Sequence, residues 1–473
     1  MPHVSLKQLE SILEGRLTKP AFGLPCRWNE QFGVSIDTRT LQPGELFFAI
    51  HGQQHNGHAF LPEAIRNGAS GVIIDEDLNY SLTVPSLKVS DTTEALQKLA
   101  RWHRQQFDAL VVGITGTAGK TTTREALHYL LDSQHQGIRS PQNYNNQWGV
   151  PLSLLTLDAS HEYALIEMGA GQPGDIAQAC QWAAPEVGIL TSIGPAHLDG
   201  LINLHGVLST KAELLDQLPK GGFAVLPFSP EYRDDLKSHA NCRIVTVGAD
   251  ASDDYFIRPQ MRTATHQVCL VNQVPFPLPF ASEVLASCCF QAVAVCSELG
   301  MPLDQLSQKL KDFTPLAGRG AVISVGPWQL IDESYNANPI SMGAALNTLA
   351  CHVGSSSTIA VLGDMAELGS LSSHWHQKIG QLVANRSIDF LAAYGSHSKD
   401  VASGAISAGM PVGQVVASTD FEVIVSVVQC WLQENSTVMI KGSRLTQMER
   451  LIPSLKLWAK EQTPKPASLP RAA

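Results

Sequence analysis

Short, uncharged apolar runs recur along this chain, and longer stretches with the apolar spacing of a helix lie between them. Continuous apolar runs of this kind are typical of parallel strands that are covered on both faces. The clearest runs are 71–74, 109–114, 163–166, 187–190, 223–226, 358–362 and 438–440. Residues 94–106 and 121–131 carry a helical pattern. Strands that alternate with helices predict an α/β fold.

Three breaks in this pattern predict the domain boundaries. A chain of 473 residues exceeds one ordinary core. A polar helix end near 104–108 precedes a new strand, and the segment LAGRG at 316–320 precedes a fresh series of strands and helices. From Glu461 onward, prolines and small polar residues dominate. We therefore predict domains at 1–105, 106–318 and 319–460, and a disordered tail at 461–473.

Composition narrows the classes of function. Lys and Arg total 33 against 43 Asp and Glu, which gives a net charge of −10. An acidic chain without a basic block is a poor nucleic-acid binder, so no nucleic-acid partner is expected. The nine cysteines are scattered without a CxxC pair, so neither zinc nor a disulfide framework is expected. No signal segment and no apolar run long enough for a membrane span is found, so we expect a soluble, cytoplasmic protein.

The segment TGTAGKTT at 115–122 follows the strand predicted at 109–114 and opens the next helix. Glycines at 116 and 119 let backbone amides close around phosphate oxygens, and the helix N-terminus adds positive potential. Lys120 is placed to reach the β- and γ-phosphates, and the Thr121 hydroxyl to ligate Mg²⁺. Ile114 stands where the usual phosphate-loop pattern has its first glycine. A chance Gly-Lys-Thr is the alternative, but the strand and helix context favours nucleotide binding.

Several further segments resemble the Mur ligase superfamily, whose members join amino acids or peptides to carboxylates. The loop spacing itself is similar to that superfamily. The other matching segments are SIDTR at 35–39, PGELFFA at 43–49, NYNNQWGVP at 143–151, EMGA at 167–170, IGPAHLDG at 193–200, KAEL at 211–214, DESYNANPISM at 332–342, LGDMAELG at 362–369 and KGSR at 441–444. They resemble most closely the branch that joins UDP-N-acetylmuramoyl-tripeptide to D-alanyl-D-alanine, in peptidoglycan precursor synthesis. The resemblance spans about residues 35–449.

The resemblance implies an architecture and a reaction. It implies a UDP-sugar-binding N-terminal domain, a central phosphate-loop ATPase domain with a parallel sheet, and a C-terminal Rossmann-like domain. ATP phosphorylates the substrate carboxylate, and the amine of D-alanyl-D-alanine displaces phosphate from the acyl phosphate. Such a reaction brings negative charges together, so the site needs cations and positioning more than a strong base. We expect ATP, two Mg²⁺ ions, both substrates as partners, a monomer, and hinge motion between domains.

Roles for individual residues follow from the same resemblance. The expected catalytic residues are Lys120, Lys211, His197 and Arg319. Thr121, Glu167, His197 and Lys211 are the expected Mg²⁺ ligands, and Lys211 is expected to be carbamylated because an ammonium cannot ligate a metal. The expected nucleotide contacts are Gly116, Thr117, Ala118, Gly119, Lys120, Thr121, Thr122, Asp332, Tyr335, Asn336 and Asn338. The expected substrate contacts are Asp37, Thr38, Arg39, Phe48, Asn145, Asn146, Asp364, Lys441 and Arg444.

Two departures from the family pattern leave alternatives open. Relatives carry Gly-x-His-Asn-x-x-Asn before the last central helix, where this chain has SEVLASC at 282–288. They also often carry Asn-x-Asp where this chain has PFS at 227–229. One alternative is therefore a nucleotide-binding scaffold without turnover. Another is a sibling ligase that adds a single amino acid, although its Asp-Asn-Pro-Arg segment is not found here. Taken singly, each site residue could also be a cap, a turn residue or a surface charge.

Overall fold

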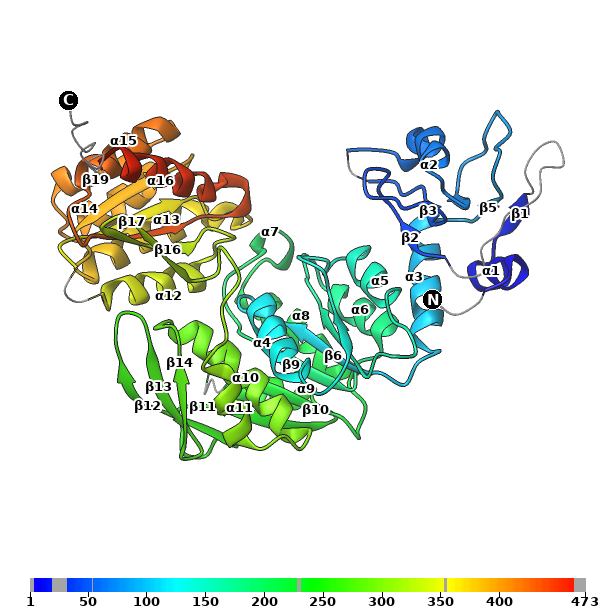
Figure 1. The fold of residues 1–473 in the computed structure, drawn as a ribbon, viewed down its shortest axis with the longest axis horizontal. Helices are drawn as coiled ribbons and strands as arrows, with labels where there is room; N and C mark the ends of the chain where they lie inside the picture. The colour runs from blue at the N-terminus through cyan, green and yellow to red at the C-terminus, as the bar shows by residue number, and fades with distance from the viewer. Residues whose placement is uncertain (1–3, 19–31, 53, 228–230, 353–354, 463–473) are drawn as a thin grey trace, which may run out of the picture. The chain divides into compact units, whose positions relative to one another are not determined.

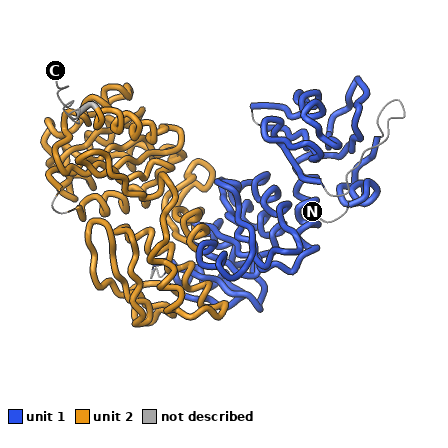
Figure 2. Tube along the Cα trace, in the orientation of Figure 1, with its two compact units in different colours: residues 1–116, 127–190, 209–245 blue, residues 117–126, 191–208, 246–473 orange. Residues whose placement is uncertain are grey.

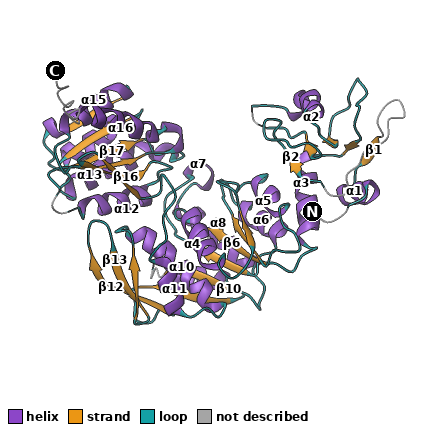
Figure 3. Ribbon diagram, viewed as in Figure 1, coloured by secondary structure: helices purple, strands orange, loops and turns teal. Residues whose placement is uncertain are grey.

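The structure is a computed structural model, and it describes residues 4–18, 32–52, 54–227, 231–352 and 355–462. Helices alternate with strands along these residues, and the strands form three sheets, which confirms the α/β prediction (Figures 1 and 3). The chain divides into two compact units (Figure 2). Unit 1 comprises residues 1–116, 127–190 and 209–245, and unit 2 comprises residues 117–126, 191–208 and 246–473.

The first sheet of unit 1 has five strands. Their order is β1 (Arg16–Thr18), β5 (Ser86–Lys88), β4 (Gly71–Ile74), β3 (Leu46–Phe48) and β2 (Val34–Ser35). The strands from β2 to β5 are parallel and β1 is antiparallel. All four residues of β4 are buried, as the run at 71–74 predicts. The accompanying helices are α1 (Leu6–Leu13), the 3-10 helix η2 (Gly57–Phe60), α2 (Leu61–Arg66) and α3 (Thr92–Arg104).

Unit 1 also contains the parallel strands that precede the candidate site. Their order is β10 (Phe223–Pro227), β9 (Val187–Leu190), β6 (Leu110–Thr115), β8 (Tyr163–Glu167) and β7 (Gly137–Arg139). Every residue of β8 and β9 is buried, which explains why these strands are continuously apolar. The helices are α5 (Gly149–Leu154), α6 (Asp175–Ala183), α9 (Arg233–His239) and most of α8 (Leu204–Gln217). The predicted runs at 109–114, 163–166, 187–190 and 223–226 are thus confirmed as strands.

Unit 2 begins with the first residues of α4 (Lys120–Leu131) and includes α7 (Leu198–Leu201). The end of β11 (Arg243–Gly248) pairs with β12, and three antiparallel strands follow each other. These are β12 (Tyr255–Arg262), β13 (Gln267–Val271) and β14 (Val274–Leu278). The turn between β13 and β14 consists of Asn272 and Gln273, both at positive φ, which matches the twist of a two-residue hairpin. Helices α10 (Glu283–Glu298) and α11 (Leu303–Leu310) follow.

The last sheet, also in unit 2, has six strands. Their order is β15 (Ala321–Val325), β16 (Trp328–Glu333), β20 (Thr437–Lys441), β17 (Thr358–Gly363), β18 (Phe390–Tyr394) and β19 (Val415–Ser418). All neighbours are parallel except β15 and β16. Alternate residues of β17 belong to separate apolar clusters, with Ala360 and Leu362 in one and Ile359 and Val361 in the other. The helices are α12 (Pro339–Ala350), α13 (Ser372–Asn385), α14 (Ser398–Ser407), α15 (Phe421–Trp431) and α16 (Leu451–Gln462) (Figure 1).

The predicted domain boundaries at 105/106 and 318/319 remain predictions. Helix α16 extends to Gln462, so the predicted tail begins inside a helix, and its remaining residues 463–473 lie outside the described residues. Of the departures from the family pattern, Phe228 and Ser229 also lie outside them. In the part of the chain that the structure describes, no helix combines the length and the apolar character needed to cross a membrane.

Candidate functional site

The loop before α4 has the backbone that its glycines predict. Gly116 and Gly119 adopt φ values of +142° and +89°, a region that L side chains rarely occupy. Gly119 is also close to helix α10, because a Cβ at this position would lie 2.7 Å from the Cys288 Sγ. Burial raises the pKa of the Cys288 thiol to about 11, so this side chain acts as an apolar support for the loop. Both glycines are therefore required by conformation, and one of them also by packing.

The middle of the loop is fixed by the residues that follow β9. The amides of Thr117 and Ala118 donate to the carbonyl and hydroxyl oxygens of Ser192, both at 2.9 Å. The Thr117 hydroxyl donates to the Gly194 carbonyl at 3.0 Å. These two amides are thus engaged inside the protein, and the first turn of α4, which begins at Lys120, is the part of the loop that presents a helix N-terminus. Contacts of Thr117, Ala118 and Thr122 with a nucleotide stay predictions.

Arg319 lies beside the phosphate loop within unit 2. Its Nη2 donates to the Thr121 hydroxyl at 2.9 Å, and its guanidinium lies 4.0 Å from the ring centre of Tyr335. The Asp332 carboxylate, which is 4% exposed, accepts from the Gly318 amide at 2.8 Å and so fixes the turn that carries Arg319. The structure therefore brings together a cation and a hydroxyl that the sequence separates by 198 residues.

The segment after β16 is attached to the same loop. Asn338 caps α12 by accepting from the Ser341 amide at 2.9 Å, and its Nδ2 donates to the Thr117 carbonyl at 3.3 Å. Lys441, which is almost fully buried, contacts the Glu333 carboxylate at 3.1 Å and the Asn336 carbonyl at 3.0 Å. These bonds fix residues 333–338 and are structural in character. Contacts of Asp332, Tyr335, Asn336, Asn338 and Lys441 with ligands remain untested predictions.

The His197 Nδ1 contacts the Glu367 carboxylate inside unit 2. Both residues adopt positive φ values, +53° and +60°, which non-glycine residues rarely do and which often occur at functional sites. The hydrogen bond from His197 holds the pKa of the Glu367 carboxyl below its ordinary value, against the opposing effect of burial. A carboxylate on Nδ1 orients the ring and leaves Nε2 on the side away from that carboxylate, which is the usual arrangement of a metal-ligating histidine.

Two other expected substrate contacts in unit 2 have partners within the protein. The Asp364 carboxylate accepts from the amides of Ser396 and His397 at 2.8 and 3.0 Å, and so fixes the turn after β18. Arg444 is exposed and pairs with Glu449 at 2.6 Å. Their roles toward a substrate remain predictions, and Asp364 in particular is engaged in shaping a loop.

In unit 1, Glu167 and Asn145 are brought together. The Asn145 Nδ2 donates to the Glu167 carboxylate at 2.8 Å, and Glu167 is 2% exposed at the end of β8. Asn146 instead accepts from the amides of Trp148 and Gly149, so it shapes the start of α5. Lys211 lies on α8 and is 1% exposed. A buried lysine and a buried carboxylate are unusual in a protein core, which makes both positions candidates for function.

The N-terminal candidates lie in the loop after β2 and in β3. Arg39 donates to both carboxylate oxygens of Asp37, and this hydrogen bond lowers the pKa of the Asp37 carboxyl despite the opposing effect of burial. Thr38 is buried, and its carbonyl accepts from Asn67 at 2.9 Å. Phe48 is fully buried, so its ring has no face for a ligand in this conformation. The roles of these residues in substrate binding remain predictions.

Three family models match the chain along most of its length. They are described as Mur ligase family, catalytic domain, at 32–104, Mur ligase middle domain at 114–284, and Mur ligase, glutamate ligase domain, at 318–444. The UDP-N-acetylmuramoyl-tripeptide–D-alanyl-D-alanine ligase of Escherichia coli K12 is 32% identical over 466 residues, covering 96% of this chain and 99% of that relative. The chain belongs to the Mur ligase family. The enzyme of the same name from Haemophilus influenzae is 31% identical and covers 89% of this chain and 93% of its own.

Solved structures give the same result for the fold of this Mur ligase. A structure of MurF from Acinetobacter baumannii has a TM-score of 0.86 at 26% identity, covering 97% of this chain and all of its own. A structure of MurF ligase from Thermotoga maritima in complex with ADP has a TM-score of 0.81 at 25% identity, covering 91% and 99%. The sequence resemblance and the three-domain α/β architecture expected from it are thereby confirmed.

Sequence reasoning missed the residues that hold the phosphate loop of this Mur ligase from behind. The Thr191 and Ser192 hydroxyls both donate to the Ala118 carbonyl, and the Gln291 amide donates to the Thr191 carbonyl at 3.2 Å. Their position in the sequence could have indicated them, because they are polar and come immediately after β9. Ligand sites of open α/β sheets lie at the carboxyl ends of strands. The segment at 282–288 forms the start of α10, where Ser282 is the N-cap and Cys288 is beside Gly119. The segment that departs from the family pattern therefore packs against the phosphate loop at Gly119.

Proposed function

We propose that the protein joins D-alanyl-D-alanine to UDP-N-acetylmuramoyl-tripeptide at the expense of ATP. The observation that carries the proposal is the position of Arg319 on Thr121, in a chain that resembles ligases of this name over nearly its whole length. A fixed guanidinium at the entry of α4 suits the charge that develops when a carboxylate attacks the γ-phosphorus. The Pγ–O bond to ADP breaks, and the product is an acyl phosphate and ADP.

The second step joins the two substrates. The amine of D-alanyl-D-alanine attacks the acyl carbon, the C–O bond to phosphate breaks, and the amine loses its proton as the peptide bond forms. Lys120 and Arg319 compensate the phosphate charge in both steps, and Asn145 and Asn146 orient the acceptor peptide. The cysteines of the described residues are free, as is usual in a reducing compartment, so we propose that the enzyme is cytoplasmic. We also propose that it acts as a monomer.

Two Mg²⁺ ions complete this proposal. Thr121 and Glu167 would hold the first ion, and His197 and Lys211 would hold the second. Buried Glu167 fits this role because a carboxylate away from water is stabilised by a cation. Bound Mg²⁺ supplies positive charge to the phosphate oxygens. Lys211 fits only as its carbamate, which provides the oxygens that Mg²⁺ prefers.

The ligase proposal is tested by phosphate release with ATP, UDP-N-acetylmuramoyl-tripeptide and D-alanyl-D-alanine. We expect release only when both substrates are present. Lys120→Ala should lower kcat at least about 100-fold, because it removes a fixed charge from the transition state. Lys220→Ala, a change of an exposed lysine in the turn before β10, is the matched control and should leave kcat unchanged.

Other outcomes of this assay would identify the alternatives. If the protein binds ATP but releases no phosphate with any pair of substrates, the result would support the nucleotide-binding scaffold. Release driven by a single amino acid, and not by D-alanyl-D-alanine, would support the sibling ligase.

Carbamylation is tested separately by native mass spectrometry in bicarbonate. We expect a mass increase of one CO₂ in the wild-type chain and none in Lys211→Arg. Equal masses for the two chains, after the substitution is allowed for, would refute the carbamate while leaving the ligase proposal intact.

A further inference from the structure

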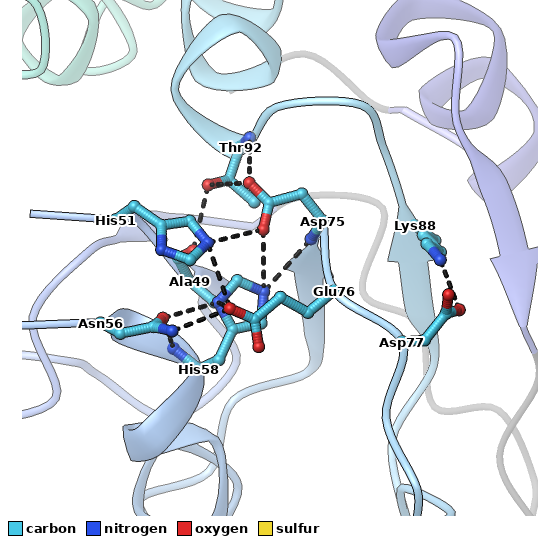
Figure 4. A network of polar contacts seen from close by, with 9 residues as sticks. All are labelled: Ala49, His51, Asn56, His58, Asp75, Glu76, Asp77, Lys88 and Thr92. Carbon is cyan, nitrogen blue, oxygen red and sulfur yellow. Dashed lines mark hydrogen bonds and ion pairs between the residues drawn. The ribbon is translucent and has the colours of Figure 1, made fainter.

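Two histidines and an aspartate lie together in the part of unit 1 that contains the first sheet. His51 is in the loop after β3 and forms an isolated β-bridge with Asn56. His58 lies on η2, and Asp75 follows the last residue of β4. Figure 4 shows both imidazole rings directed toward the Asp75 carboxylate. Three short segments thus present one side chain each to a common point.

The hydrogen bonds of His58 assign its proton. The Asn56 Nδ2 donates to Glu76 at 2.8 Å, so its Oδ1 is the acceptor that faces the His58 Nδ1 at 2.9 Å. Nδ1 therefore carries the proton, and Nε2 accepts from the Asp75 amide at 3.2 Å. The His58 side chain is only 4% exposed. The single lone pair of Nε2 is thus directed at the Asp75 amide, and the Asp75 carboxylate lies beside it at 3.2 Å.

The Asp75 carboxylate is fixed so that one oxygen faces both rings. Its Oδ2 accepts from the Thr92 amide at 3.1 Å. Its Oδ1 lies 3.0 Å from the His51 Nε2 and 3.2 Å from the His58 Nε2. Neither atom of the second contact carries a proton, so a cation that replaces the amide bond to Nε2 would have His58 and Asp75 as ligands. Asp77 takes no part, because it pairs with Lys88 (Figure 4).

The distances match those of a small, tightly bound ion. Zinc lies about 2.0–2.1 Å from imidazole nitrogen and carboxylate oxygen, so the ligand atoms of a tetrahedral site are about 3.3 Å apart. The three ligand atoms here all lie within 4.8 Å of one another. The Glu76 Oε1 lies 3.4 Å from the His51 Nε2 and is placed as a fourth ligand. His51 is 49% exposed and Glu76 44% exposed, which leaves the site open to ions from solvent.

We propose that His51, His58 and Asp75 bind one divalent transition-metal ion of the zinc class. Two imidazoles with one or two carboxylates favour zinc and its neighbours over Mg²⁺ or Ca²⁺, which prefer all-oxygen sites. The Asn56 contact to Nδ1 and the Thr92 contact to Oδ2 are the supporting hydrogen bonds that metal ligands usually have. The ion would tie His51 and η2 to the end of β4. The scattered cysteines predict no zinc site of their own, and this site uses none of them.

The test measures Zn²⁺ binding to the full chain after chelator treatment, by competition with a chromophoric chelator. His51→Ala is the informative variant, because this half-exposed side chain is removed without opening the core. We expect the wild-type chain to bind one Zn²⁺ more tightly than His51→Ala by at least about tenfold. His55→Ala, an exposed histidine in the same loop, is the matched control and should bind as the wild type does. Co²⁺ should give the visible absorption of a tetrahedral ion only in the wild type and the control.

Any Zn²⁺ bound at the phosphate-loop site would bind equally to the wild type, His51→Ala and His55→Ala. It therefore does not affect the differences in Zn²⁺ affinity among these chains. Equal Zn²⁺ affinity and stoichiometry in His51→Ala and the wild type would overturn the proposal, and so would a wild type that binds no Zn²⁺. In that case the cluster is a hydrogen-bond network in which His51 donates to Asp75. Thermal unfolding without metal checks that His51→Ala is folded, and His51→Gln replaces it if it is not.

Discussion

Replacing Gly119 with alanine tests the packing of the phosphate loop on helix α10. Gly119 has a φ of +89°, and a side chain in this region costs about 1–3 kcal/mol. The new Cβ would also lie 2.7 Å from the Cys288 Sγ, and overpacking of this kind costs about 1–3 kcal/mol. The sum is about 2–6 kcal/mol, which is a large part of the total stability of a typical domain, about 5–15 kcal/mol.

A double-mutant cycle separates the two costs. In a Cys288→Ala background the sulfur is gone, so Gly119→Ala should cost only the backbone strain, about 1–3 kcal/mol. Hydrogen exchange of the peptides that cover 109–131 reads the local free energy of opening in each of the four chains. Gly221→Ala is the control, because a Cβ there meets nothing within 4 Å and its cost should be under about 0.5 kcal/mol. If Gly119→Ala costs the same in both backgrounds, within about 0.5 kcal/mol, the contact with Cys288 is refuted.

Three further changes test other parts of the structure. Arg319→Lys should lower kcat for phosphate release about 100-fold, because it loses the bond to Thr121, and unchanged kcat would contradict this role. Lys441→Met leaves the Glu333 carboxylate without Lys441 and should lower the free energy of opening of β16 and β20, measured by hydrogen exchange, by about 3 kcal/mol. Adding Glu333→Gln should restore most of this free energy. Burial lowers the pKa of His103 to about 4, so the unfolded chain takes up its proton first and stability falls as the pH drops from about 6.5 to 4. In His103→Gln, the free energy of urea unfolding should fall less over this pH range than in the wild type, by up to roughly 3 kcal/mol. The same pH dependence in both chains would argue against this assignment.

The sequence by itself determined the parts of the protein that depend on local pattern. Continuous apolar runs predicted β4, β6, β8 and β9, since each of these strands is buried on both faces. The glycines of the phosphate loop predicted a backbone at positive φ, which the structure has at Gly116 and Gly119. Long motifs predicted the Mur ligase family. These features are visible because the reason for each residue lies within a few neighbours in the chain.

Tertiary structure alone decided which distant residues meet. The chain order does not fix strand order, so nothing in the sequence placed β20 between β16 and β17, where Lys441 reaches Glu333. The antiparallel strands β12–β14 were not predicted. Charged and polar residues interrupt β12 after three positions, and β14 contains Pro275 and Pro277, which disfavour a strand.

The contacts of the candidate sites were decided in the same way. The sequence indicated Arg319 and Thr121 separately, and folding joined them across 198 residues. The cluster of His51, His58 and Asp75 has no spacing that resembles a metal motif, because a strand, a loop and a helical turn bring its three side chains together. Contacts of this kind depend on the geometry of packed elements, which local patterns do not encode.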